Sequence, residues 1–154
     1  MQFSFTLTED LSLRQRIFSA LSFLSAHEVR VGLPASAGWR NRSILAIQEH
    51  GSPVNRIPAR PVIRPALQAE PTRSAMADAM EQGIRSAMNG DLPGAEHSLS
   101  AAGQAGADGI RAYIDSHIPP PNSPATVRRK GFDKPIYDTG ELYRAFSYEV
   151  AERE

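Results

Sequence analysis

The chain has no cysteine among its 154 residues, which excludes disulfides and thiolate metal ligands and favours synthesis in a reducing compartment. It lacks any run of about 20 apolar residues, the length that a membrane-spanning helix needs. The N-terminus has neither a basic start nor a long apolar stretch, so no signal peptide is expected. The formal net charge is zero, so no overall field attracts nucleic acid or acidic membranes. These absences predict a soluble single domain, residues 1–154, made in the cytoplasm.

Charge is nevertheless distributed unevenly along the chain. Six arginines lie between residues 40 and 73 with only two acids, whereas the last 22 residues carry six acids. The two stretches therefore have opposite sign. They can meet within one molecule or between neighbouring subunits of a ring.

Local patterns predict an α+β fold, with a small, mostly antiparallel sheet packed against several helices. Apolar residues alternate in three short segments, as in strands, and recur every three or four residues elsewhere, as in helices. The expected elements are strands 2–7, 27–33 and 146–150, helices 9–25 and 44–50, a helix from residue 65 or 71 to residue 89, a helix from the 91–94 turn to residue 117, and short helices 124–130 and 140–145.

Residues 71–117 are expected to form a central helical hairpin. Met76, Met80, Ile84 and Met88 mark one face of its first helix at steps of four, and this face is expected to be core. The hairpin is either the plain helical middle of the domain or an insertion with its own partner. Trp39 stands in a stretch rich in glycine, serine and arginine, which predicts an exposed position in a loop.

Two proline-rich segments, far apart in the chain, are its most distinctive feature. The first joins Glu49-His50-Gly51, at a predicted helix end, to Ile57-Pro58-Ala59-Arg60-Pro61. Each proline lacks an amide donor and restricts the residue before it, so residues 53–65 cannot be continuous helix. The second runs from Pro119-Pro120-Pro121-Asn122-Ser123-Pro124 to Arg128-Arg129-Lys130-Gly131 and then to Asp138-Thr139-Gly140. It predicts an extended path followed by a short helix that Ser123 caps.

In motif and in order, these segments resemble the neck and tail-completion proteins, the minor tail components of long-tailed bacteriophages and prophages. That family has the same helix end, the same Ile-Pro-Ala-Arg-Pro turn and a late Pro-Pro-Asn-Ser-Pro-Ala-Thr stretch. The resemblance implies a non-enzymatic virion structural protein of the tail or neck, made in the host cytoplasm. It also implies contacts with other tail or neck proteins and assembly as a ring, from a subunit that can stay monomeric in isolation.

The resemblance implies structural roles for the residues that carry it. These are Glu49, His50, Gly51, Pro58, Pro61, Asp138, Thr139 and Gly140.

Two of these patterns also have a chemical interpretation. Glu49 next to His50 suggests acid–base chemistry, but neighbours on a helix point about 100° apart. Asp138-Thr139-Gly140 matches the triplet of aspartic proteases, which need two such loops, or one per chain in a symmetric dimer, between hydrophobic strands. Capping or packing is the preferred interpretation of both patterns, and we expect no catalytic, metal-binding or cofactor-binding residue and no cofactor. A hydrolase would require His50 and Asp138 to converge in one pocket.

The chain also has candidates for contacts with neighbouring subunits. They are Trp39, Arg56, Arg60, Arg64, Arg128, Arg129 and Lys130. Prolines stiffen the segments around the arginines, which lowers the entropy lost on docking, and arginine makes planar contacts with several donors. An ordinary rigid loop explains residues 60–64 equally well.

The same cations support a second hypothesis, a small DNA-binding accessory protein that uses the arginine- and lysine-rich loops. That function requires binding that depends strongly on salt, because each phosphate contact releases counterions. In a virion structural protein, DNA contact would be incidental. No membrane partner is expected in either case.

Overall fold

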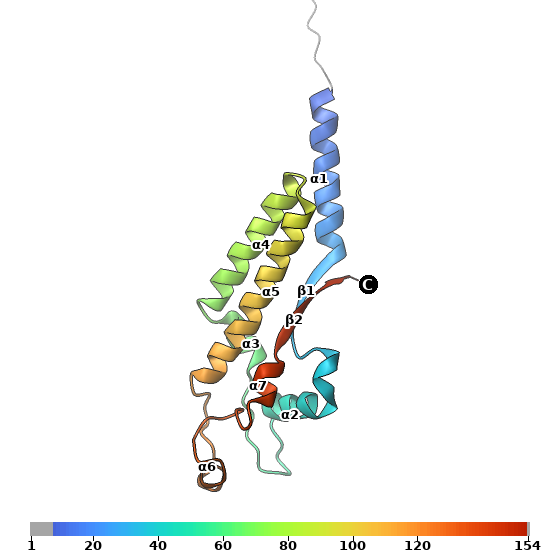
Figure 1. The fold of residues 1–154 in the computed structure, drawn as a ribbon. Helices are drawn as coiled ribbons and strands as arrows, with labels where there is room; N and C mark the ends of the chain where they lie inside the picture. The colour runs from blue at the N-terminus through green and yellow to red at the C-terminus, as the bar shows by residue number, and fades with distance from the viewer. Residues whose placement is uncertain (1–7, 154) are drawn as a thin grey trace, which may run out of the picture.

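The computed structural model describes residues 8–153, with side chains from residue 12 onward. In chain order its elements are α1 (Thr8–Ala26), β1 (His27–Gly32), the 3-10 helix η1 (Ala35–Ala37), α2 (Gly38–His50), α3 (Ile63–Gln68), α4 (Thr72–Met88), α5 (Leu92–Asp115), α6 (Pro124–Lys130), α7 (Glu141–Ala145) and β2 (Ser147–Glu152). The predicted α+β class, antiparallel sheet and central hairpin are confirmed, and the hairpin is α4–α5 (Figure 1). The predicted strand 2–7 lies outside the described residues.

The two described strands come from opposite parts of the chain and pair antiparallel, with Val31 opposite Tyr148. Helix α5 packs against both strands. Val31 and Tyr148 point toward α5, where they meet two of its glycines. On the other face, Arg30 and Glu149 form an ion pair at 3.4 Å. The sheet therefore has one face covered by α5 and one charged face.

The main core gathers around the C-terminal half of α5. Its buried members are Leu45, Val62, Ala66, Ile110, Ile114, Ile118, Leu142 and Phe146. They come from α2, α3, α5, α7 and the segments between them, so burying them joins parts of the chain that are distant in sequence. The C-terminal half of α5 is thus integral to the domain and is not a separate appendage.

Glycine in the middle of α5 allows close packing on two sides. A Cβ atom on Gly103 would lie 2.4 Å from Cδ2 of Tyr148, and one on Gly109 would lie 2.3 Å from the side chain of Thr72. Real side-chain atoms do not approach so closely. These glycines therefore let β2 and the start of α4 contact the helix directly, which offsets their cost of about 1 kcal/mol each in helix propensity.

The prediction that the methionine face of α4 is core is wrong. Met80, Ile84 and Met88 are 45%, 49% and 38% exposed, and only Met76 is half-buried. The buried residues of α4 are instead small ones, Thr72, Gly83 and Ala87. The small residues let α4 approach α5 closely, and this turns the long side chains outward.

Helix α2 begins at Gly38, whereas the sequence predicted a start at Ile44 with Ser43 as the cap. The residue before the helix, Ala37, provides no side-chain cap, so the sequence carries no local signal for this start. Trp39 therefore lies on a helix and not in a loop. Its predicted exposure is confirmed, at 75%.

Helix α1 extends past the turn of the α4–α5 hairpin (Figure 1). A second, smaller core forms where α1 meets the hairpin, with buried Ala20, Ala87 and Ala95. Phe18 and Leu21 remain more than half exposed on the same helix. Within residues 8–153, no helix combines the length and apolar character needed to cross a membrane.

We predict that Gly103→Ala lowers the free energy of unfolding by about 1–2 kcal/mol, because the new methyl group overlaps the base of the Tyr148 side chain. Urea denaturation measures the change. Gln104→Ala, at the exposed neighbouring position, is the control and should change stability by less than about 0.5 kcal/mol. A Gly103→Ala chain as stable as wild type would contradict the close contact of α5 with β2.

Candidate functional site

Arg60 joins the two proline-rich segments. It is buried, with 6% of its surface exposed, and its Nε donates to the carbonyl oxygen of Pro120 at 2.7 Å. Its Nη2 donates to the carbonyl oxygen of Pro121 at 3.0 Å. Burial lowers the pKa of Arg60, and the negative charge of Asp133 opposes that shift. Segments 60 residues apart in the chain therefore share one buried cation.

Proline supplies the acceptors for this contact. Pro119 and Pro120 form a bend with a cis peptide bond between them, and not the extended path that the sequence predicted there. A proline has no N–H group to bond a neighbouring carbonyl, so carbonyl oxygens in a proline-rich stretch remain available. Two neighbouring carbonyls match the forked donors of a guanidinium group. A lysine ammonium has no such planar fork.

Glu49 holds the other end of the first segment. Its Oε1 accepts hydrogen bonds from the backbone N–H groups of Val62 at 2.8 Å and Ile63 at 2.9 Å. Amides at a helix start have no partner within the helix, and that end also favours a negative charge. Val62, next to α3, offers no side-chain cap of its own. A carboxylate on α2 therefore caps α3.

Gly51 makes the sharp turn between α2 and the first segment possible. Its φ is 74°, and a Cβ atom there would lie 2.8 Å from the backbone nitrogen of Ala59. Pro58 and Pro61 are exposed on this segment. His50 is exposed at the end of α2 and makes no hydrogen bond within the described part of the chain, so the capping or packing role predicted for it is not found.

The second proline-rich segment is stabilised by hydrogen bonds between its own residues. Ser123 caps α6 by accepting from the N–H of Thr126, and Gly131 ends the helix in the left-handed conformation, as predicted. Lys130 Nζ donates to the carbonyl oxygens of Lys134, at 2.7 Å, and Tyr137. Burial lowers the pKa of Lys130. Lys130 thereby fixes the loop that follows α6.

The triplet Asp138-Thr139-Gly140 leads into α7. Thr139 Oγ1 accepts from the N–H of Glu141 at 3.3 Å, and Gly140 has a φ of 79°. Asp138 does not cap the helix but lies 3.7 Å from Arg129. The contacts of the triplet are therefore those of a helix start.

Two of the predicted interface cations are used inside the subunit. Arg60 and Lys130 both donate to backbone carbonyls, so their placement does not fit a contact with a neighbouring subunit. The physical reason is the same for both, because proline-rich turns leave carbonyls without amide partners. The other candidates are exposed: Trp39, Arg56, Arg64, Arg128 and Arg129.

The side chains that a hydrolase would need have separate surroundings. Asp138 lies beside Arg129, and no hydrogen bond joins it to His50 in residues 8–153. The same part of the chain holds no cluster of three acidic or histidine side chains that could bind a metal ion. The structure therefore brings together the motif residues of the two proline-rich segments and not an acid–base pair.

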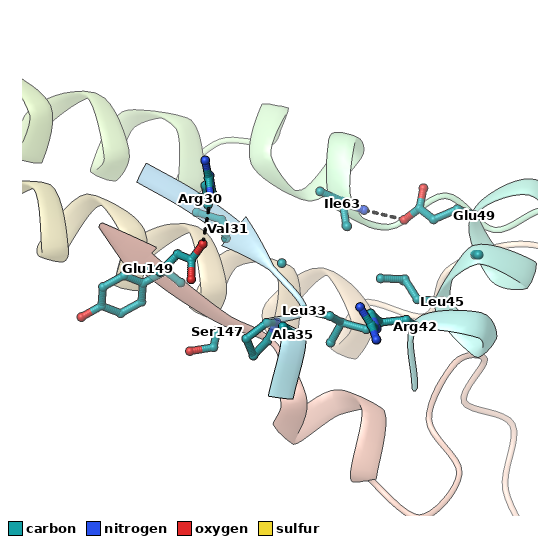
Figure 2. A pocket seen from close by; sticks show the side chains of 14 residues that line it. Arg30, Val31, Leu33, Ala35, Arg42, Leu45, Glu49, Ile63, Ser147 and Glu149 are labelled. Atoms are coloured by element: carbon teal, nitrogen blue, oxygen red, sulfur yellow. Dashed lines mark hydrogen bonds and ion pairs between the residues drawn. The ribbon is translucent and has the colours of Figure 1, made fainter. Parts of the chain in front are cut away.

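A groove of about 480 Å³ lies between β1 and α2, and we call it the β1–α2 groove (Figure 2). Its lining residues are Arg30, Val31, Gly32, Leu33, Pro34, Ala35, Arg42, Leu45, Ala46, Glu49, Ile63, Ser147, Tyr148 and Glu149. Arg30 pairs with Glu28 and Glu149, and Glu49 caps α3. The side chain of Arg42 is exposed and makes no ion pair or hydrogen bond with any residue that the structure describes.

Sequence reasoning missed this groove. Arg42 belongs to the arginine-rich stretch between residues 40 and 73, but no local pattern shows that β1 lies beside it. The groove forms only when the chain folds back on itself.

Comparisons of the chain with protein-family models, with curated proteins and with solved structures find no match. What the protein does is therefore inferred from its own residues and their contacts.

We predict that Arg60→Ala lowers the free energy of unfolding by about 2–4 kcal/mol, because two charged hydrogen bonds disappear. Arg60→Lys should recover part of the loss, since one ammonium cannot reproduce the fork. Urea denaturation compares these variants with Arg64→Ala, an exposed arginine on α3, which should stay within about 0.5 kcal/mol of wild type. Equal stability of the Arg60→Ala and Arg64→Ala chains would show that the contact does not hold the segments together.

Proposed function

We propose that this chain is a non-enzymatic structural protein of a bacteriophage or prophage virion, acting in tail completion or in head–tail joining. One observation carries the proposal. The residues through which the chain resembles that family lie far apart in sequence, yet Arg60 of the first segment binds the carbonyls of Pro120 and Pro121 in the second. Motif residues that contact one another support a shared structure better than two unrelated matches would.

The same contacts create a surface suited to assembly. Arg60 and Glu49 fix the proline-rich segments from inside, so docking a partner against them orders few additional residues and costs little entropy. Trp39, at the start of α2, and Arg64 and Arg128 remain exposed. Exposed tryptophan and arginine are the side chains that contribute most at protein interfaces.

Apolar side chains are also exposed on the long helices. Phe18 and Leu21 on α1 and Met80 and Ile84 on α4 are each at least 45% exposed. Exposed apolar side chains mark protein contact surfaces where they form a contiguous patch. The proposed partners are other tail or neck proteins and further copies of this chain in a ring within the virion, with the free subunit made in the host cytoplasm.

No contact in the described residues favours the DNA-binding alternative. Arg60 and Lys130, two cations on which it would depend, donate to carbonyls of their own subunit. The remaining cations of that hypothesis, Arg56, Arg64, Arg128 and Arg129, are exposed and could contact phosphates, which position a protein on DNA without reading its sequence.

We predict that inactivating the gene in the phage or prophage that carries it leaves heads and tails unjoined, as counted by electron microscopy. Wild type and Gln104→Ala should restore joined particles, whereas Trp39→Ala should not. Loss of an exposed aromatic anchor weakens binding by about 2 kcal/mol or more while leaving the fold intact.

Two results would count against the proposal. The first is a null mutant that produces joined, infectious particles in normal numbers. The second is tight binding of the purified chain to a DNA duplex that weakens steeply with added salt, which would favour the accessory function instead.

A further inference from the structure

Strand β1 has an edge that no described strand covers. The N–H of Arg153 donates to the carbonyl of Ala26, so these two residues form a hydrogen-bonded pair between the strands. In an antiparallel pair of strands, every second residue of β1 then hydrogen-bonds to β2, and the residues between them do not. The N–H and C=O groups of Val29 and Val31 consequently point away from β2. Within residues 8–153, no other backbone or side-chain group hydrogen-bonds them. An open strand edge is a template for a further strand.

The β1–α2 groove lies at the second half of this strand. Gly32 and Leu33 contribute to the groove from the end of β1 and the residue after it, Leu45 and Ile63 line it from α2 and α3, and Ser147 and Glu149 line it from β2 (Figure 2). A strand added to the edge of β1 would therefore place alternate side chains against apolar walls.

The charged side chains that line the β1–α2 groove indicate which kind of segment could bind there. Arg30 and both carboxylates of the groove already have partners, whereas Arg42 has none in the described part of the chain. An occupant that brings a carboxylate close to Arg42 would satisfy the remaining charge. The groove thus fits an extended segment with apolar side chains on one face and an acidic residue beside it.

The chain itself contains such a segment at its start. Phe3, Phe5 and Leu7 alternate with polar residues, and Glu9 and Asp10 follow directly. We propose that residues 2–7 of one copy add as a strand to β1 of a second copy, in its β1–α2 groove, with the acidic pair near Arg42.

The segment cannot reach the groove of its own copy. Helix α1 has 19 residues and therefore separates Thr8 from the start of β1 by about 28 Å. Residue 2 lies six positions before Thr8, which spans at most about 21 Å when fully extended. Strand β1 then continues away from the end of α1 (Figure 1). Only another copy can supply the strand.

The sheet of three strands predicted from the sequence is thereby completed between two molecules. The start of α1 and the β1–α2 groove are different surfaces, so the contact is heterologous. Such contacts close into a ring when the rotation permits and otherwise form a filament. This inference concerns the chain's contact with itself and does not depend on a role in a virion.

Cross-linking tests the contact directly, because the chain has no cysteine of its own. A Ser4→Cys chain is mixed with an Ala46→Cys chain, whose new thiol lies in the groove, and a short bismaleimide links thiols that come close. The matched control replaces Ala46→Cys by Gln82→Cys, an exposed position on α4. Intact mass measures the yield of linked heterodimers.

The expected result is a severalfold higher yield with Ala46→Cys than with Gln82→Cys, lost when Phe3→Ser and Phe5→Ser are added to the Ser4→Cys chain. Equal yields at the two positions, or no linked heterodimer, would overturn the proposal. A link within single molecules of a Ser4→Cys/Ala46→Cys chain at high dilution would also overturn it.

Light scattering across protein concentration gives a second, independent readout. Arg42→Glu should weaken self-association about tenfold, because it sets a carboxylate against the acidic pair. Adding Glu9→Lys and Asp10→Lys to that chain should restore association. Failure of the charge swap to restore it would show that these groups do not meet.

Discussion

The buried guanidinium of Arg60 is the contact on which the arrangement of the motif residues depends. A buried cation needs acceptors that water no longer provides, and here they are the carbonyls of Pro120 and Pro121. The hydrogen bonds of Arg60 therefore hold the segment after α5 against the segment before α3. Glu49 adds a second tie by capping α3 from α2. Helices α3 and α6 are short and have few buried residues of their own, so these polar contacts between segments help to hold them in place.

These contacts within the subunit determine which side chains remain exposed for contact with partner proteins. Because Arg60 and Lys130 are used inside the subunit, Trp39, Arg64 and the arginines of α6 are what remain on its surface. The open edge of β1 and the unpaired Arg42 form a second surface, suited to an extended segment. The proposed tail or neck function and the proposed strand exchange use different parts of this subunit.

Local signals allowed much of the fold to be predicted from the sequence. Ser123 and Gly131 set the limits of α6 through cap geometry, and helical spacing over residues 71–117 predicted the α4–α5 hairpin. The predictions that were wrong concern positions whose structure depends on residues far away in the sequence. The small residues of α4 pack against α5 and leave Met80 turned outward, and α2 starts without a capping residue. Arg60 was assigned to an interface because its acceptors lie 60 positions away, and the groove likewise forms only in the folded chain.

Amide hydrogen exchange tests the central claim, that Arg60 couples the two proline-rich segments. The informative amides are those of Val62 and Ile63, bound to Glu49, and of Asn122, bound to Asp133. Under conditions where both chains are folded, Arg60→Ala should speed exchange at all three amides, while amides of the N-terminal half of α5 keep their protection. Faster exchange in the first segment alone, with Asn122 unchanged, would contradict the claim.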